Sequence, residues 1–307
     1  MTGVDLSTRV GAVSLANPVL AASGTFGYGL DLVEFCPPER LGGLVTKGLS
    51  PRPRAGNPTP RIVETAAGMI NAIGLQNIGV EAFCADVLPE LRPRGAVVVV
   101  NVFGERPDEY VAVMERCEQE QGIAGYELNV SCPNVKAGGM EFGHDAIQLE
   151  RLTSLCRAIT RRPLWVKLSP NAPSLADTAR AAVAGGADAL TLINTLRAMA
   201  IDAVRRRPVL ASACGGLSGP AVKPVALRMV WEVHRALPQV PLVGIGGVET
   251  GRDVAEFLLA GASAVQVGTA IFRSPSAPLR IVREFEEFCA DHGVAAATEL
   301  VGGLQWG

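Results

Sequence analysis

Residues 242–269 read LVGIGGVETGRDVAEFLLAGASAVQVGT and contain a complete strand–helix–strand unit. Two short apolar runs, Leu242–Ile245 and Ala264–Val267, flank a segment with helical spacing of apolar residues. Thr250 is placed to cap a helix over Gly251–Ala260. Continuous apolar runs are typical of strands that are buried on both faces of a parallel sheet. The stretch therefore predicts a β/α repeat.

Eight such runs occur along the chain and favour a closed barrel over an open sheet. A length of 307 residues suits one (β/α)8 TIM barrel, so we expect a single domain over residues 1–307. Residues 48–74 and 196–219 are too long for simple turns, and we expect them to be loop insertions that shape an active site. The other six runs are Pro18–Ala22, Gly43–Thr46, Val97–Val100, Tyr126–Val130, Leu164–Leu168 and Ala189–Ile193.

Composition excludes several classes of protein. The formal net charge of −2 gives no electrostatic reason to expect binding to nucleic acid or to a membrane. The start of the chain lacks the apolar core of a signal peptide, and no apolar stretch is long enough to span a bilayer. The seven cysteines are scattered and form no C-x-x-C, so we expect a reduced, cytoplasmic protein without a disulfide framework. The three histidines follow no metal-site spacing, and we expect no bound metal.

Polar residues or glycines follow all eight apolar runs. In a β/α barrel the carboxyl ends of the strands meet at one face, where active sites are found. Polar endings at all eight strands therefore predict a binding site at that face. The residues are Ser23, Lys47, Asn101, Asn129 with Cys132, Lys167, Asn194 with Thr195, Gly246 with Gly247, and Gly268 with Thr269.

The last two endings predict a phosphate site. Gly246-Gly247 and Gly268-Thr269 follow the seventh and eighth strands, which form the usual phosphate-binding corner of this fold. Glycines allow backbone N–H groups to approach a phosphate closely. Glu249 occupies the place of the third glycine in a dinucleotide fingerprint, so a mononucleotide phosphate is favoured. The alternative is that Gly246-Gly247 forms only a tight turn.

The amides, lysines and one thiol at this face suit a flat, neutral ring with one anionic group. Cys132 lies in residues 129–134, NVSCPN, just beyond the fourth strand. A thiol has an ordinary pKa near 8.5, and it acts as a base where its surroundings favour loss of the proton. The alternative is that Cys132 is a small buried apolar residue, the common fate of a free cysteine.

These residues resemble the class 1 dihydroorotate dehydrogenases, and the resemblance extends over nearly the whole chain. It is closer to the NAD-linked type B branch than to the fumarate-using type A branch. The most specific motif is NVSCPNVK at residues 129–136. The others are NPVLAASGTFG (17–27), TKG (46–48), NAIGLQN (71–77), GLSGPA (216–221) and GIGGV (244–248).

The resemblance implies oxidation of (S)-dihydroorotate to orotate in pyrimidine biosynthesis, with FMN accepting the electrons. It implies that Cys132 removes the proton from substrate C5 while hydride leaves C6. Substrate would be held by Lys47, Asn71, Ala72, Ile73, Gly74, Leu75, Asn129, Asn134, Asn194 and Thr195. FMN would be held by Ser23, Lys47, Gly48, Asn101, Asn129, Lys167, Ile193, Gly219, Gly246, Gly247, Gly268 and Thr269.

Type B enzymes pair with an electron-transfer subunit that holds FAD and a [2Fe–2S] cluster. The resemblance therefore implies a homodimer of catalytic chains inside a heterotetramer, with electrons passed to NAD. Two places depart from the family pattern: Arg197-Ala198 after the sixth strand, and Ala213-Cys214 before Gly215. These departures bear on the long loop rather than on the chemistry.

Three other readings stay open. The first is a flavin barrel acting on a different ring, such as a dihydropyrimidine dehydrogenase or a dihydrouridine synthase. The second is a phosphosugar isomerase or lyase without redox chemistry, which explains the phosphate corner but not Lys47, Asn129 and Cys132. The third is an inactive barrel that serves as an assembly scaffold.

Overall fold

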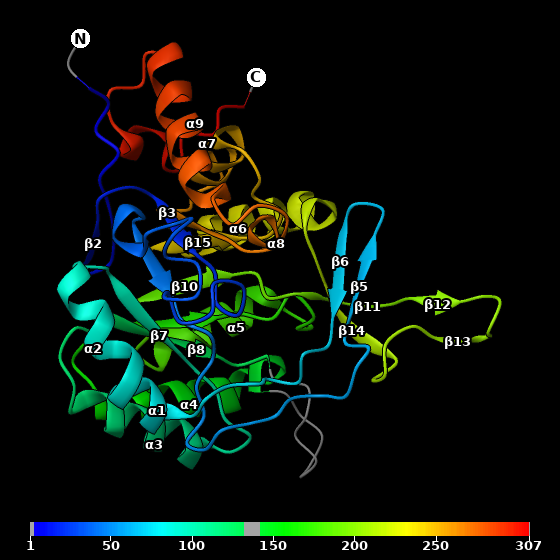
Figure 1. Cartoon of the computed structure of the whole chain (residues 1–307). Helices are drawn as coiled ribbons and strands as arrows, with labels where there is room; N and C mark the ends of the chain where they lie inside the picture. Colours follow the sequence, from blue (N-terminus) through cyan, green and yellow to red (C-terminus); the bar gives the residue numbers. More distant parts are fainter. Residues whose placement is uncertain (1–2, 132–141, 307) are drawn as a thin grey trace.

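Eight parallel strands close into a barrel in the computed structural model of this chain, which describes residues 3–131 and 142–306 (Figure 1). The strands pair around the barrel in the order β10-β15-β16-β3-β4-β7-β8-β9. Each coincides with one of the eight predicted apolar runs, which confirms the expected (β/α)8 fold. Their bounds are β3 Val19–Ala21, β4 Gly43–Val45, β7 Val98–Val102, β8 Gly125–Asn129, β9 Leu164–Lys167, β10 Ala189–Leu192, β15 Leu242–Ile245 and β16 Ala264–Val267.

Helices cover the outside of the barrel (Figure 1). No amphipathic helix joins β3 to β4; the connection holds a short 3-10 turn at Pro38–Arg40, where consecutive prolines lack the N–H groups that a longer helix needs. The prediction that a helix follows every barrel strand is therefore wrong at this one connection. The helices are α1 Val80–Ala82, α2 Leu88–Leu91, α3 Pro107–Glu118, α4 Ala146–Ile159, α5 Leu175–Ala184, α6 Lys223–Ala236, α7 Gly251–Leu259, α8 Ala270–Arg273 and α9 Ala277–Asp291.

Helix α7 begins as its sequence predicts. The Thr250 side chain accepts a hydrogen bond from Asp253 N, and the Asp253 carboxylate accepts one from Thr250 N, which completes a capping box. Gly261 then adopts φ +111°, a conformation that ends a helix and that side chains disfavour. In α4, Asp145 caps the first turn by accepting from the N–H groups of Ile147 and Gln148. No helix in the described part of the chain is long and apolar enough to cross a membrane.

The amino end of the barrel is closed by apolar packing. The hairpin of β1 (Thr8–Val10) and β2 (Val13–Leu15) packs its apolar residues against an inner layer of strand side chains. Alternate residues on each strand face inward, so this layer and the layer above it occupy the barrel interior. The inner layer consists of Leu20, Val45, Val99, Trp165, Ala189, Val243 and Ala264.

The two long segments contain strands as well as loops. They supply β5 (Ile62–Thr65), β6 (Gly68–Asn71), β11 (Leu196–Met199) and β14 (Cys214–Ser218), which form one antiparallel sheet in the order β11-β14-β6-β5. This sheet stands beside the barrel, and a hairpin of β12 (Ile201–Asp202) and β13 (Arg207–Pro208) projects away from it (Figure 1).

Candidate active site

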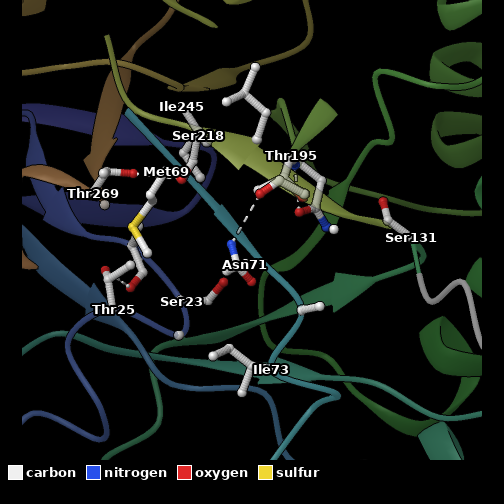
Figure 2. A pocket seen from close by; sticks show the side chains of 18 of the residues that line it. Ser23, Thr25, Met69, Asn71, Ile73, Ser131, Thr195, Ser218, Ile245 and Thr269 are labelled. Carbon is white, nitrogen blue, oxygen red and sulfur yellow. Dashed lines mark hydrogen bonds between the residues drawn. The ribbon is translucent and has the colours of Figure 1, made fainter. Parts of the chain in front are cut away.

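A cavity of about 730 Å³ lies between the carboxyl ends of the barrel strands and the four-stranded sheet. Its volume falls in the range of small-molecule and cofactor sites. Figure 2 shows Asn71 near the centre of the view, with Ser23 and Thr25 on one side and Thr195 and Ser131 on the other. Barrel strands and inserted segments therefore contribute polar side chains to the same space.

The structure brings the predicted site residues together. Every one of them within the described residues lines this cavity, while Cys132 and Asn134 lie outside the described residues. Their individual roles stay predictions. The lining residues are Ser23, Lys47, Gly48, Asn71, Ala72, Ile73, Gly74, Leu75, Asn101, Asn129, Lys167, Ile193, Asn194, Thr195, Gly219, Gly246, Gly247, Gly268 and Thr269.

Lys167 ends β9 with its side chain almost completely buried. Its Nζ donates to Ser23 Oγ at 3.0 Å and lies 3.9 Å from the Glu127 carboxylate. Burial lowers the pKa of Lys167 from its ordinary value, and the negative charge of Glu127 partly opposes this effect. The cavity is thus lined by an amine that is fixed by its contacts with Ser23 and Glu127.

Lys47 follows β4 and is half-buried. Burial, followed by the nearby Arg61 cation, lowers its pKa, while Asp31 acts in the opposite direction. Lys47 makes no ion pair with any described residue, and its side chain lines the cavity. An anionic ligand group at this position would offset the effects of burial and of Arg61 by stabilising the lysine cation.

A chain of amides links the ends of two barrel strands, β8 and β10, at the cavity wall. Asn194 Nδ2 donates to Asn129 Oδ1 at 3.2 Å, and Thr195 N donates to Asn194 Oδ1 at 2.8 Å. Ser131 N also donates to Asn129 Oδ1, and the backbone carbonyl of Asn129 accepts from Tyr110 OH at 2.8 Å. These bonds fix the amides in place before any ligand arrives, as a preorganised site requires.

Residues 71–75 are held against the cavity from two sides. On one side, Asn57 Nδ2 donates to Ala72 O and Asn57 N donates to Ile73 O, both at 2.9 Å. On the other side, Asn71 Nδ2 donates to Gly216 O at 3.4 Å (Figure 2). The segment is therefore an ordered wall.

The predicted phosphate corner is a tight backbone turn that lines the cavity. Gly246 and Gly247 adopt φ +129° and +74°, and a Cβ on Gly247 would lie 2.8 Å from Lys223 Cβ. Only glycine fits such a conformation and approach without strain. Beside the turn, Thr269 Oγ1 donates to Ser218 Oγ at 2.8 Å. Gly246-Gly247 therefore does form a tight turn, and because this turn lines the cavity, the phosphate site stays a prediction.

Two polar residues in this region were missed by the sequence analysis. Glu127 and Gln266 are fully buried, and both lie inside barrel strands that were read as apolar runs. Gln266 lines the cavity, and its Nε2 donates to Glu127 Oε2 at 2.6 Å. A charged or amide side chain within an otherwise apolar strand was the signal that could have identified them.

The sequence departures also lie at the cavity. Arg197 is exposed and lines it, and Arg197 N donates to Asn171 Oδ1 at 3.2 Å. Cys214 lines the same cavity from β14, next to Ala213, which adopts φ +62°. The departures therefore affect the wall of the cavity formed by the sheet.

Comparisons with known proteins place this geometry in a family. A family model described as dihydroorotate dehydrogenase matches residues 5–289. A protein of Geobacter sp. (strain M21), named dihydroorotate dehydrogenase B (NAD(+)), catalytic subunit, is 52% identical over 301 residues, 98% of each chain. A protein of Pelobacter propionicus with the same name is 53% identical, over 98% of this chain and 99% of its own.

Structural similarity agrees with the fold. The crystal structure of DHODH in complex with ferulenol from Eimeria tenella matches 97% of this chain and 88% of its own, with a TM-score of 0.82 at 23% identity. That likeness shows the shared barrel, while the sequence relatives show the family and confirm the resemblance to the type B branch. The chain belongs to the dihydroorotate dehydrogenase family.

Proposed function

We propose that this chain oxidises (S)-dihydroorotate to orotate with FMN as its bound electron acceptor, in pyrimidine biosynthesis. The observation that carries the proposal is that two lysines, the linked amides and the glycine corner formed by Gly246 and Gly247 all line one cavity. The residues fit a flavin mononucleotide, because buried acceptor atoms at Asn101 and Gln266 have no partner among the described residues.

The chain's own residues divide the work. Lys47 would pair with the substrate carboxylate, and Asn71, Asn129, Asn194 and Thr195, with Asn134, would hold the pyrimidine ring. Cys132 would remove the proton from C5, so that the C5–C6 double bond of orotate forms as hydride leaves C6. FMN, when bound, supplies the oxidising ring that accepts this hydride.

The cofactor site would use the remaining lining residues. Gly246, Gly247, Gly268 and Thr269 would hold the phosphate through backbone N–H groups. Lys167 would lie beside the pyrimidine edge of the ring and stabilise negative charge there. The other contacts would come from Ser23, Gly48, Asn101, Asn129, Ile193 and Gly219.

We infer further that the chain acts as one half of an assembly. The relatives are named catalytic subunits, which supports a partner that takes the electrons on to NAD. We propose a homodimer of this chain joined to subunits that hold FAD and a [2Fe–2S] cluster. The projecting β12–β13 hairpin, with Ile201 and Val204 exposed, supports contact with another chain. The described cysteines are free thiols, in keeping with a cytoplasmic enzyme.

An anaerobic titration tests the proposed reaction. The purified, flavin-loaded protein is mixed with dihydroorotate, and the flavin absorbance near its visible maximum is followed. Stoichiometric bleaching, with orotate as the product, is expected. A protein that binds no flavin, or a bound flavin that bleaches with dihydrouracil but not with dihydroorotate, would refute the proposal.

A further inference from the structure

Glu127 is a buried carboxylate beneath the cavity that the proposed reaction does not use. It lies on β8 with no exposed surface, and it does not line the cavity itself. Asn101 Nδ2 on the neighbouring β7 donates to Glu127 Oε1 at 2.8 Å. Gln266 Nε2 on β16, on the opposite side of the barrel, donates to Glu127 Oε2 at 2.6 Å. The carboxylate therefore spans the barrel interior.

A carboxylate can only accept hydrogen bonds, and this fixes the orientation of both amides. Each amide must turn its NH2 group toward Glu127 and its carbonyl oxygen away. Those oxygens, Asn101 Oδ1 and Gln266 Oε1, are buried and have no partner among the described residues. Both side chains line the cavity. Lys167 Nζ lies 3.9 Å from Glu127 Oε1, so an amine also faces the carboxylate.

The absence of a side chain at position 48 keeps one of these acceptors open. A Cβ on Gly48 would lie 2.8 Å from Asn101 Oδ1, closer than real Cβ contacts. The cavity floor thus presents carbonyl acceptors, while Lys167 presents a cationic donor beside them. The pyrimidine edge of a flavin has the complementary pattern, with carbonyl oxygens on either side of the N3–H donor.

We propose that Glu127 is a positioning residue that makes the cavity select a ring carrying an N–H donor at its edge, by holding the amides of Asn101 and Gln266 with their carbonyl oxygens toward that ring. The inference rests on the proposed function, because the ring is taken to be FMN. Glu127 acts through the two amides and does not touch the ring.

Glu127→Gln tests the inference with almost no change in volume. The introduced amide brings its own NH2 group, so either Asn101 or Gln266 must turn its carbonyl toward it and its NH2 group toward the cavity, and one of the two acceptors that face the ring is lost. The apoprotein is titrated with FMN labelled with ¹⁵N at N3, following flavin fluorescence and the N3–H signal by NMR. FMN affinity should fall by about tenfold or more, and the N3–H proton should exchange faster with water than in the wild type.

Glu118→Gln is the matched control. Glu118 accepts from Tyr126 OH and Thr160 Oγ1, and it does not line the cavity. Its replacement also removes a carboxylate that accepts two hydrogen bonds, yet FMN affinity and N3–H exchange should match the wild type. Loss of FMN binding in this control would mean that any such carboxylate matters, which would overturn the specific role of Glu127.

The swapped variant Glu127→Gln/Gln266→Glu restores the pattern. The carboxylate moved to position 266 would accept from the NH2 group of the amide at position 127. The carbonyl of that amide would accept from Asn101 Nδ2, so Asn101 Oδ1 and the second oxygen of the carboxylate at position 266 both face the cavity, and two acceptors are present again. We expect the protected N3–H signal and most of the FMN affinity to return. This variant supplies the test if Glu127→Gln does not fold.

The outcomes separate this inference from the proposed function. Wild-type protein that binds no FMN would contradict the proposed function. Wild-type protein that binds FMN with a freely exchanging N3–H, or Glu127→Gln that keeps the wild-type affinity and signal, would contradict the inference alone. A folded swapped variant without the protected signal would also contradict it.

Discussion

Lys167 shows at the scale of one residue how the barrel prepares the site. Its amine is buried, bonded to Ser23 and close to Glu127. In such surroundings a charge interacts more strongly than it does in water, and its position needs no rearrangement when negative charge develops nearby. The amine is therefore suited to a role in cofactor binding.

Replacing Lys167 tests that role. Lys167→Ala should weaken FMN binding by about tenfold or more, or slow flavin reduction, because a charge-assisted donor is lost. Fluorescence titration and stopped-flow reduction measure the two effects. Arg180→Ala, which removes an exposed cation paired with Asp177, should change neither. Unchanged values for Lys167→Ala would assign the lysine a purely structural role.

The thiol of Cys132 carries the chemical prediction. Cys132→Ala should retain bound FMN but reduce it with dihydroorotate at least about a hundredfold more slowly, since only the base is removed. Anaerobic stopped-flow absorbance measures the rate. Cys156→Ala, in the buried face of helix α4, serves as the control and should reduce FMN at a wild-type rate. Near-wild-type reduction by Cys132→Ala would end the claim of proton abstraction.

At the scale of elements, the turn between β15 and α7 is held in shape from beneath. Asp253 accepts hydrogen bonds from Glu249 N and Thr250 N at 2.8 Å and from Lys223 Nζ at 2.6 Å. Burial opposes ionisation of Asp253, but the bonds from Lys223 and the two backbone groups more than offset it, so its pKa lies below 3.8. The carboxylate thus stabilises the turn that carries the glycine corner.

Asp253→Asn should lower the free energy of unfolding by about 1–3 kcal/mol at pH 7. A carboxyl whose pKa is lowered by folding stabilises the protein at pH values above its pKa in the unfolded state. This stabilisation is lost as the pH falls through the pKa of the folded state. The difference between variant and wild type should therefore shrink below pH 3.8. Urea unfolding at pH 7 and below pH 3.8 measures this difference in the free energy of unfolding. Asp177→Asn, at the same position of helix α5 but exposed, should show a smaller effect; equal losses in the two variants would contradict the account.

The presence of individual strands and helices could be predicted from the sequence more fully than the pairing of strands that are distant in the chain. The apolar runs predicted every barrel strand, and Thr250 predicted the start of α7, because both signals are local. The four-stranded sheet was missed, since β6 pairs with β14 across well over a hundred residues and β14 contains two adjacent glycines, which weaken a strand pattern. The link between Glu127 and Gln266 was missed for the same reason: it crosses a barrel whose closure no local pattern specifies.

At the scale of the whole molecule, the barrel separates stability from function. An apolar layer and the β1–β2 hairpin close the amino end, while polar side chains and the inserted sheet surround the cavity at the carboxyl end.

The partner proposal predicts what the isolated chain cannot do. Purified alone, the flavin-loaded protein should be reduced by dihydroorotate yet reduce NAD at a negligible rate, because no relay connects the two. The absorbance of NADH measures its formation, and addition of the FAD and [2Fe–2S] subunit should restore it. Efficient NAD reduction by the isolated chain would show that the assembly is unnecessary.

A crystal structure of the FMN-loaded protein with orotate tests the central claim most directly, since that claim concerns where one sulfur atom lies relative to two rings. We predict that the pyrimidine lies against the flavin inside the cavity and that Cys132 Sγ approaches orotate C5 to within about 4 Å on the opposite side. Electron density that places this sulfur among aliphatic side chains, remote from both rings, would contradict the account.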